Sequence, residues 1–127
     1  MIETQPVAPY VRLEHRRVGT GRLAATVQDV CGQESPDFVD GTVFGRDENY
    51  LTLGWFTDDP GPGPSDYTGQ RIFYKSIRER TTDVLTTHDY IWRWDTDWFW
   101  CSRAFGVQNP AVRRLWPRRW RRSDVYR

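Results

Sequence analysis

The sequence predicts an α+β fold: a β-α-β-β unit at residues 10–57, part of a ferredoxin-like layer, and an aromatic-rich helical segment at residues 86–127. Three segments alternate apolar and polar residues, and a segment with helical spacing separates the first from the other two. Four of the seven tryptophans gather at residues 88–105. Only 38% of the 127 residues are hydrophobic, which is low for a compact domain, and the 15% of residues that are aromatic partly offset this.

The chain is predicted to begin with a short tail that leads into a strand. Residues 1–9 include two prolines and few apolar side chains, which indicates an extended tail. Apolar and charged side chains then alternate over residues 10–18, as in a strand with one buried face. The residues expected on that buried face are Val11, Leu13 and His15.

A helix and a hairpin are predicted to follow this strand. Thr20 is expected to cap the helix and Gly32 to end it. Two further strands, at residues 38–44 and 50–57, flank a polar turn, and so short a connection predicts an antiparallel hairpin. Gly41 marks a bulge or the close approach of another element.

Residues 58–85 are predicted to be a loop and an extended segment. Three prolines and two glycines at residues 58–65 exclude a helix or a strand there. Residues 66–80 alternate apolar and polar side chains on both faces, which predicts extended chain.

A long aromatic helix is predicted to begin at Thr86 or Thr87 and to end at Gly106. Its main apolar stripe consists of Ile91, Trp94, Trp98, Cys101 and Phe105. A second stripe consists of Trp92, Phe99 and Arg103. Another helix is expected to begin at Asn109-Pro110, since asparagine caps helices well and proline suits the first helical position.

Charge is divided unevenly along the chain. Residues 1–87 carry nine basic and thirteen acidic side chains, whereas residues 88–127 carry nine basic and four acidic ones. Tryptophan and arginine interleave at residues 113–122, which fits packing against missing protein, contact with an anionic membrane surface, or stacking on RNA. The acidic first part and the lack of an RNA-binding motif make nucleic acid the least favoured partner, and none is expected.

Composition also limits the chemistry that the chain can perform. Cys31 and Cys101 lack metal-type spacing, and His15 and His88 are the only histidines, so no metal site is expected. Both histidines are expected to be structural, and the catalytic residues are unknown. No apolar run reaches the length of a membrane span. The expected location is the cytoplasm, with peripheral attachment to a membrane as the alternative.

Residues 19–24 match the dinucleotide-binding pattern G-x-G-x-x-A, and Asp40 lies about twenty residues further on. The strand before the pattern is too charged for the buried centre of a parallel sheet. A glycine turn that leads into an amphipathic helix is therefore the favoured interpretation.

Several segments together resemble a known family. They read DFVDGTVF (37–44), DYTGQ (66–70), FYKSI (73–77), DYIWRWDTDWFW (89–100) and FGVQNP (105–110). These segments are similar to the middle of FAD-dependent oxidoreductases of the Delta(24)-sterol reductase type, and most similar to their actinobacterial FAD-binding oxidases. The resemblance extends over nearly the whole chain from Tyr10, and the aromatic stretch is its most specific part.

The resemblance implies an architecture of the vanillyl-alcohol-oxidase type, in which one domain holds FAD and a cap domain shapes the substrate side of the flavin. It places this chain at the start of the cap, without the flavin domain, and so implies that the chain is an incomplete domain. The implied function is oxidation or reduction of a CH–CH group in a hydrophobic or sterol-like substrate, in steroid metabolism. The isolated chain is expected to be inactive.

The aromatic stretch supplies the candidate residues that line the substrate pocket: Tyr90, Trp92, Arg93, Asp95, Phe99 and Trp100. For Asp95 and Asp97 the favoured role is to pair with Arg93, Arg103 or the arginines at residues 113–122, and a polar contact to substrate is the alternative. The expected partners are the missing flavin domain and a hydrophobic small molecule. The alternative function is a small non-enzymatic α+β module whose Trp/Arg-rich C-terminal third binds a protein or a membrane surface.

Overall fold

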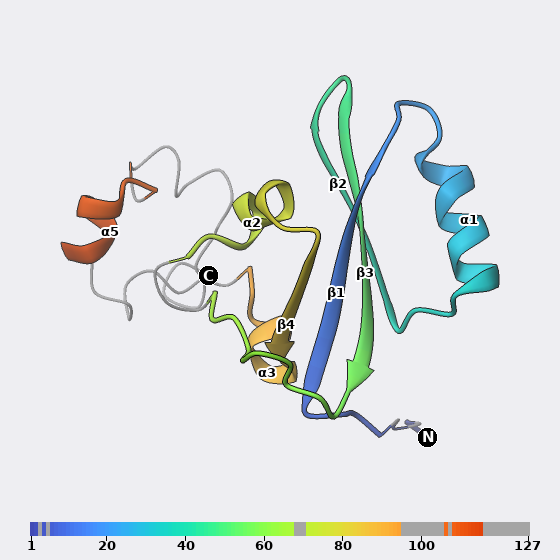
Figure 1. Cartoon of the computed structure of the whole chain (residues 1–127), viewed down its shortest axis with the longest axis horizontal. Helices are drawn as coiled ribbons and strands as arrows, with labels where there is room; N and C mark the ends of the chain where they lie inside the picture. Colours follow the sequence, from blue (N-terminus) through green and yellow to red (C-terminus); the bar gives the residue numbers. More distant parts are fainter. Residues whose placement is uncertain (3, 5, 68–70, 95–105, 107, 116–127) are drawn as a thin grey trace.

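A four-stranded antiparallel sheet forms the centre of the computed structural model, and helices lie against it (Figure 1). The structure describes residues 1–127 apart from 3, 5, 68–70, 95–105, 107 and 116–127. The described elements are β1 (Tyr10–Val18), α1 (Leu23–Gln33), β2 (Phe38–Gly45), β3 (Glu48–Thr57), α2 (Phe73–Glu79), β4 (Thr82–Thr86), α3 (Thr87–Ile91) and α5 (Pro110–Leu115). The predicted α+β class is confirmed.

The strands are ordered β2-β3-β1-β4, so the first strand lies inside the sheet. Leu13 of β1 is opposite Gly54 of β3 on one side and opposite Asp83 of β4 on the other. The predicted β2–β3 hairpin is confirmed, with an irregularity between Val43 and Gly45. The strand β4 is a fourth member of the sheet that the sequence pattern did not predict.

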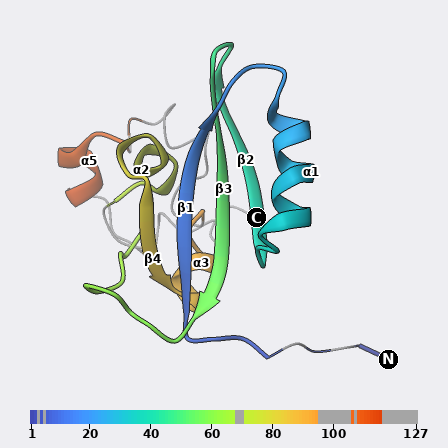
Figure 2. The same ribbon diagram turned by 45° about the vertical axis from the view of Figure 1, so that its right-hand side comes forward.

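Both faces of the sheet are covered, and helices α1 and α2 lie on opposite faces (Figure 2). On one face, Leu51 and Leu53 of β3 pack with Val30 of α1. The other face carries the predicted residues of β1, all buried, together with Phe73 and Ile77 of α2. The sheet is therefore a middle layer, and Tyr90 and Trp94 of the aromatic stretch pack on the second of these faces.

The backbone of β3 is closely packed at Gly54. A Cβ atom at this position would lie 3.2 Å from side-chain atoms of Val11, Leu13 and Phe38. Distances this short leave no room for a methyl group without movement of the core, so glycine lets β1, β2 and β3 share one compact face.

The boundaries of α1 correct two predictions. Thr20 does not cap the helix, which begins after Arg22 without a side-chain cap. The Thr20 hydroxyl instead donates to the Arg46 carbonyl at 2.6 Å and so ties this turn to the β2–β3 turn. The helix also continues one residue past Gly32, to Gln33. The prediction at Gly41 is also wrong, since the irregularity of the strand lies between Val43 and Gly45, and a Cβ at Gly41 would meet the Leu23 side chain at an ordinary contact distance of 3.5 Å.

The extended segment predicted at residues 66–80 is wrong in its second half, where α2 forms. Its buried residues Phe73, Ser76 and Ile77 follow the i, i+3, i+4 spacing of one helix face. The loop predicted at residues 58–65 is confirmed. Its end lies along the outer edge of β4, because the Ser65 amide donates to the Val84 carbonyl at 2.7 Å.

The start of the aromatic helix is predicted correctly, but its length is not. Thr86 caps α3 by accepting a hydrogen bond from the Asp89 amide at 3.0 Å. The helix then ends at Ile91, which is 62% exposed, whereas Trp94 packs on the core. The main apolar stripe is therefore wrong at its beginning. The remaining members of this stripe, Trp98, Cys101 and Phe105, lie outside the described residues. The same holds for Phe99 and Arg103 of the second stripe and for the part of the predicted helix at residues 95–105.

The second predicted helix is confirmed as α5. The Asn109 side chain accepts a hydrogen bond from the Ala111 amide at 2.9 Å, and Pro110 is the first helical residue.

Candidate functional site

The aromatic stretch is attached to the sheet through Arg93, which is 8% exposed. Its Nη2 donates to the Asp40 carboxylate of β2 at 2.5 Å, and its Nη1 donates to the Tyr90 carbonyl at 2.6 Å. Asp40 and Arg93 are far apart in sequence, so this ion pair fixes where the chain leaves α3. The predicted pairing of Arg93 with Asp95 or Asp97 involves residues outside the described ones.

Aromatic rings surround the Arg93 guanidinium. Its central carbon lies 3.9 Å from the Tyr90 ring centroid, 5.3 Å from that of Phe73 and 5.7 Å from that of Trp94. Phe73 and Trp94 are themselves in edge-to-face contact, with centroids 5.0 Å apart. Cation–π attraction and ring packing thus hold the start of the aromatic stretch in place. Burial raises the pKa of Tyr90 to about 12, so its hydroxyl stays protonated at neutral pH.

The candidate pocket residues fall into three groups. Tyr90 and Arg93 are brought together and are buried. Trp92 is 43% exposed and lies beside the exposed Ile91. Three further candidates, Asp95, Phe99 and Trp100, lie outside the described residues. The role of all six residues in binding substrate stays a prediction.

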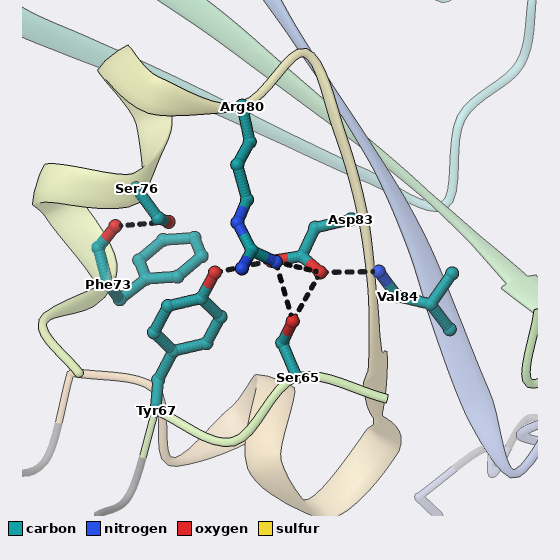
Figure 3. Close-up of polar contacts among 7 residues, drawn as sticks. All are labelled: Ser65, Tyr67, Phe73, Ser76, Arg80, Asp83 and Val84. Atoms are coloured by element: carbon teal, nitrogen blue, oxygen red, sulfur yellow. Dashed lines mark hydrogen bonds and ion pairs between the residues drawn. The ribbon is translucent and has the colours of Figure 1, made fainter. Parts of the chain in front are cut away.

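A buried polar cluster on the same face of the sheet is centred on Asp83 (Figure 3). Its carboxylate accepts hydrogen bonds from the Ser65 hydroxyl at 2.7 Å, from the Tyr67 hydroxyl and from the Val84 amide at 2.9 Å. Arg80 forms an ion pair with it at 3.1 Å and also donates to the Ser65 hydroxyl. The carboxylate is therefore well supplied with donors, and the cluster ties the loop before α2 to β4.

Sequence reasoning missed this cluster. Burial, followed by the hydrogen bond to Asp83, raises the pKa of Tyr67, so the phenol is a neutral donor rather than a base. The chemistry of the cluster is thus structural. One signal was available, since Asp83 and Leu85 are two residues apart in a strand and so share its buried face.

His15 is a second buried polar group, placed as predicted on the inward face of β1. Its Nδ1 lies 2.8 Å from the Thr52 hydroxyl, and its ring meets Phe73 edge to face. Burial lowers the pKa of His15, and the charge of Asp83 offsets part of that effect. The folded protein therefore holds His15 as a neutral imidazole more strongly than the unfolded chain does.

We expect the free energy of unfolding to fall as the pH drops below about 6.5, the ordinary pKa of histidine. Below that pH, His15 is protonated in the unfolded chain but stays neutral in the folded protein. The free energy of unfolding therefore falls by up to about 1.4 kcal/mol for each pH unit. Urea unfolding of the His15→Gln variant between pH 7.5 and 5 should show a flatter dependence than the wild type.

The His88→Gln variant is the matched control, because the side chain of His88 is 75% exposed. It should keep the wild-type dependence on pH. Equal slopes for His15→Gln and the wild type would show that His15 does not cause the effect.

The glycine pattern at residues 19–24 does not form a dinucleotide site. Such a site needs parallel neighbouring strands, whereas β1 is antiparallel to both β3 and β4. β1 lies inside the sheet, as the corresponding strand of a dinucleotide-binding fold would. The site is excluded because β1 runs antiparallel to both of its neighbours. The favoured interpretation, a glycine turn before α1, is confirmed, and Gly21 has a φ of 80° there.

Comparisons with protein-family models, with curated proteins and with solved structures give no match to this chain. Within the described residues, no helix is both long and apolar enough to cross a membrane. The same part of the chain contains no group of three or more His, Cys, Asp or Glu side chains that could hold a metal ion.

Proposed function

We propose that this chain is the substrate-side cap segment of an FAD-dependent oxidoreductase that acts on a hydrophobic, sterol-like molecule. The resemblance of the aromatic stretch to that family supports the proposal. The observation that carries it is the contrast between neighbours: Arg93 and Tyr90 are buried against the sheet, while Ile91 and Trp92 are exposed. The buried pair anchors the stretch and presents apolar side chains for a partner domain or substrate to cover.

The glycine-rich turn at residues 19–24, which resembles a phosphate-binding loop in sequence, follows an antiparallel strand and so does not support a flavin site in this chain. In the proposed enzyme the flavin carries the hydride chemistry, and another domain binds it. The role of this chain is to exclude water and to orient the substrate through Trp92 and its neighbours.

Two measurements on the purified chain test the proposal. After incubation with FAD and desalting, the chain should keep no flavin absorbance near 450 nm. It should nevertheless bind the fluorescent sterol dehydroergosterol, supplied in cyclodextrin, with energy transfer from tryptophan to sterol. Truncating Trp92 to alanine should weaken binding about ten- to a hundredfold, since a buried aromatic side chain contributes roughly 1.5–3 kcal/mol.

Val43→Ala is the control for the sterol measurement, because Val43 is also apolar and exposed, at 66%, but lies on β2. It should bind the sterol as the wild type does. Retained flavin would contradict the assignment as a cap without a flavin site. Absent energy transfer, or equal loss in Val43→Ala, would contradict the role of Trp92.

The second candidate function is a non-enzymatic module that binds a membrane surface. It is favoured by α5, where Leu115 is 85% exposed beside the exposed Arg114. Co-sedimentation with vesicles of phosphatidylserine and phosphatidylcholine separates the two functions. Binding at low salt that is lost at high salt, without sterol binding, supports the module. Sterol binding without co-sedimentation supports the cap.

A further inference from the structure

A basic pocket lies between α2 and α5. Its volume is about 380 Å³, which suits a small ligand. The two helices are joined beside it by a hydrogen bond from the Tyr74 hydroxyl to Gln108 Oε1 at 2.8 Å. A weaker one runs from Arg113 Nη2 to the Arg71 carbonyl at 3.4 Å. The pocket thus depends on the contact between α5 and the segment around α2.

Cations dominate the pocket lining. Among the described lining residues, Arg71, Lys75, Arg80 and Arg113 are basic and Glu79 is the only acid. Arg80 is already paired with Asp83. Among the described residues, the exposed side chains of Arg71 and Lys75 form no ion pair, so both are available to a ligand.

We propose that this pocket binds a phosphate group, either as free phosphate or as part of a small organic phosphate. An arginine beside a lysine offers a planar fork and a point charge, the two donor types that phosphate oxygens accept best. The site also has buried walls, since Tyr67, Ser76 and Arg113 are each at most 5% exposed. Such walls lower the local dielectric and strengthen attraction to a dianion. The proposal is independent of the proposed function, because it involves neither flavin nor sterol.

The composition of the chain provides a specific probe, because Lys75 is its only lysine. Reductive methylation with ¹³C-formaldehyde labels Lys75 and the amino group of Met1, and methylation keeps the positive charge. Inorganic phosphate is then titrated at pH 7.5, with sodium chloride holding the ionic strength constant. The Lys75 methyl resonance should shift and saturate, with a midpoint of about 1 mM or below, while the Met1 resonance should not move.

Two variants test whether phosphate binds in this pocket or is attracted by positive charge anywhere on the surface. Arg71→Ala should raise the midpoint about tenfold, because it removes a charge-assisted hydrogen bond. Arg46→Ala, which removes an exposed arginine from the β2–β3 turn, should leave the midpoint unchanged. Circular dichroism confirms that each variant is folded. A shift that never saturates, or an equal change in both variants, would overturn the proposal.

Adenosine monophosphate and adenosine distinguish the two sources of phosphate. Tighter binding of the monophosphate than of inorganic phosphate identifies an organic phosphate as the ligand. Equal binding identifies phosphate alone. Binding of adenosine as tight as that of the monophosphate would overturn the proposal, because the phosphate would then contribute nothing.

Discussion

Replacement of Asp83 by alanine is expected to lower the free energy of unfolding by about 3–5 kcal/mol, because the buried Ser65 and Tyr67 hydroxyls each lose a charged acceptor at a cost of about 1–3 kcal/mol. The side chain of Asp83 is 5% exposed, and its removal takes the acceptor from Ser65, Tyr67 and Arg80 together. Whole domains are stable by only about 5–15 kcal/mol, so the loss should be evident in a urea titration at pH 7.

Smaller changes around Asp83 test whether the network explains that loss. Tyr67→Phe and Ser65→Ala should each cost about 1–2 kcal/mol, because the carboxylate keeps its other donors. Asp58→Ala in the exposed loop after β3 should change stability by no more than about 0.5 kcal/mol. A loss below about 1 kcal/mol for Asp83→Ala would show that the cluster does not hold the loop to β4.

Replacement of Arg93 by alanine is expected to cost about 2–4 kcal/mol, from a charge-assisted hydrogen bond and cation–π contacts. The cost should stay below that of Asp83→Ala, because water can solvate Asp40, which is 39% exposed, once Arg93 is gone, whereas Asp83→Ala takes the acceptor from two buried hydroxyls. Urea unfolding measures the loss, and near-ultraviolet circular dichroism should report looser packing of Trp94.

A double-mutant cycle isolates the ion pair from the aromatic contacts. Asp40→Ala and Arg93→Ala should show a coupling energy of about 1–2 kcal/mol, with the remaining cost of Arg93→Ala due to its rings and the Tyr90 carbonyl. Arg114→Ala on exposed α5 should be neutral. A coupling energy near zero would contradict the view that Asp40 positions the aromatic stretch.

Local patterns predicted those elements whose two faces differ strongly. In β1, Val11 and Leu13 alternate with charged residues, and the strand formed where expected. In contrast, α2 has only seven residues, and its spacing fits both a helix and a strand. Phe73 and Ile77 are four residues apart, so they share one side of a helix and would also share one side of an extended segment. The strand β4 has only five residues and directs Asp83 inward, which breaks the usual apolar pattern of a buried face.

The candidate sites depend on contacts between residues far apart in sequence. Tyr90 and Arg93 stood out because of their aromatic surroundings, but their partner Asp40 belongs to a different strand. No local sequence pattern marks Lys75 and Arg71 as part of a site, since they line a pocket only when α5 packs near α2. Periodicity describes one element at a time and contains no information on such pairings.

The central position of β1 also determines the order in which the protein can assemble during synthesis. β1 leaves the ribosome before the other three strands of this sheet, yet its hydrogen-bonding partners are β3 and, much later, β4. The β2–β3 hairpin is local and can close early, whereas β1 must wait for residue 86 before both of its edges are paired. Until then the nascent chain carries an apolar strand with an open edge, the kind of segment that chaperones protect.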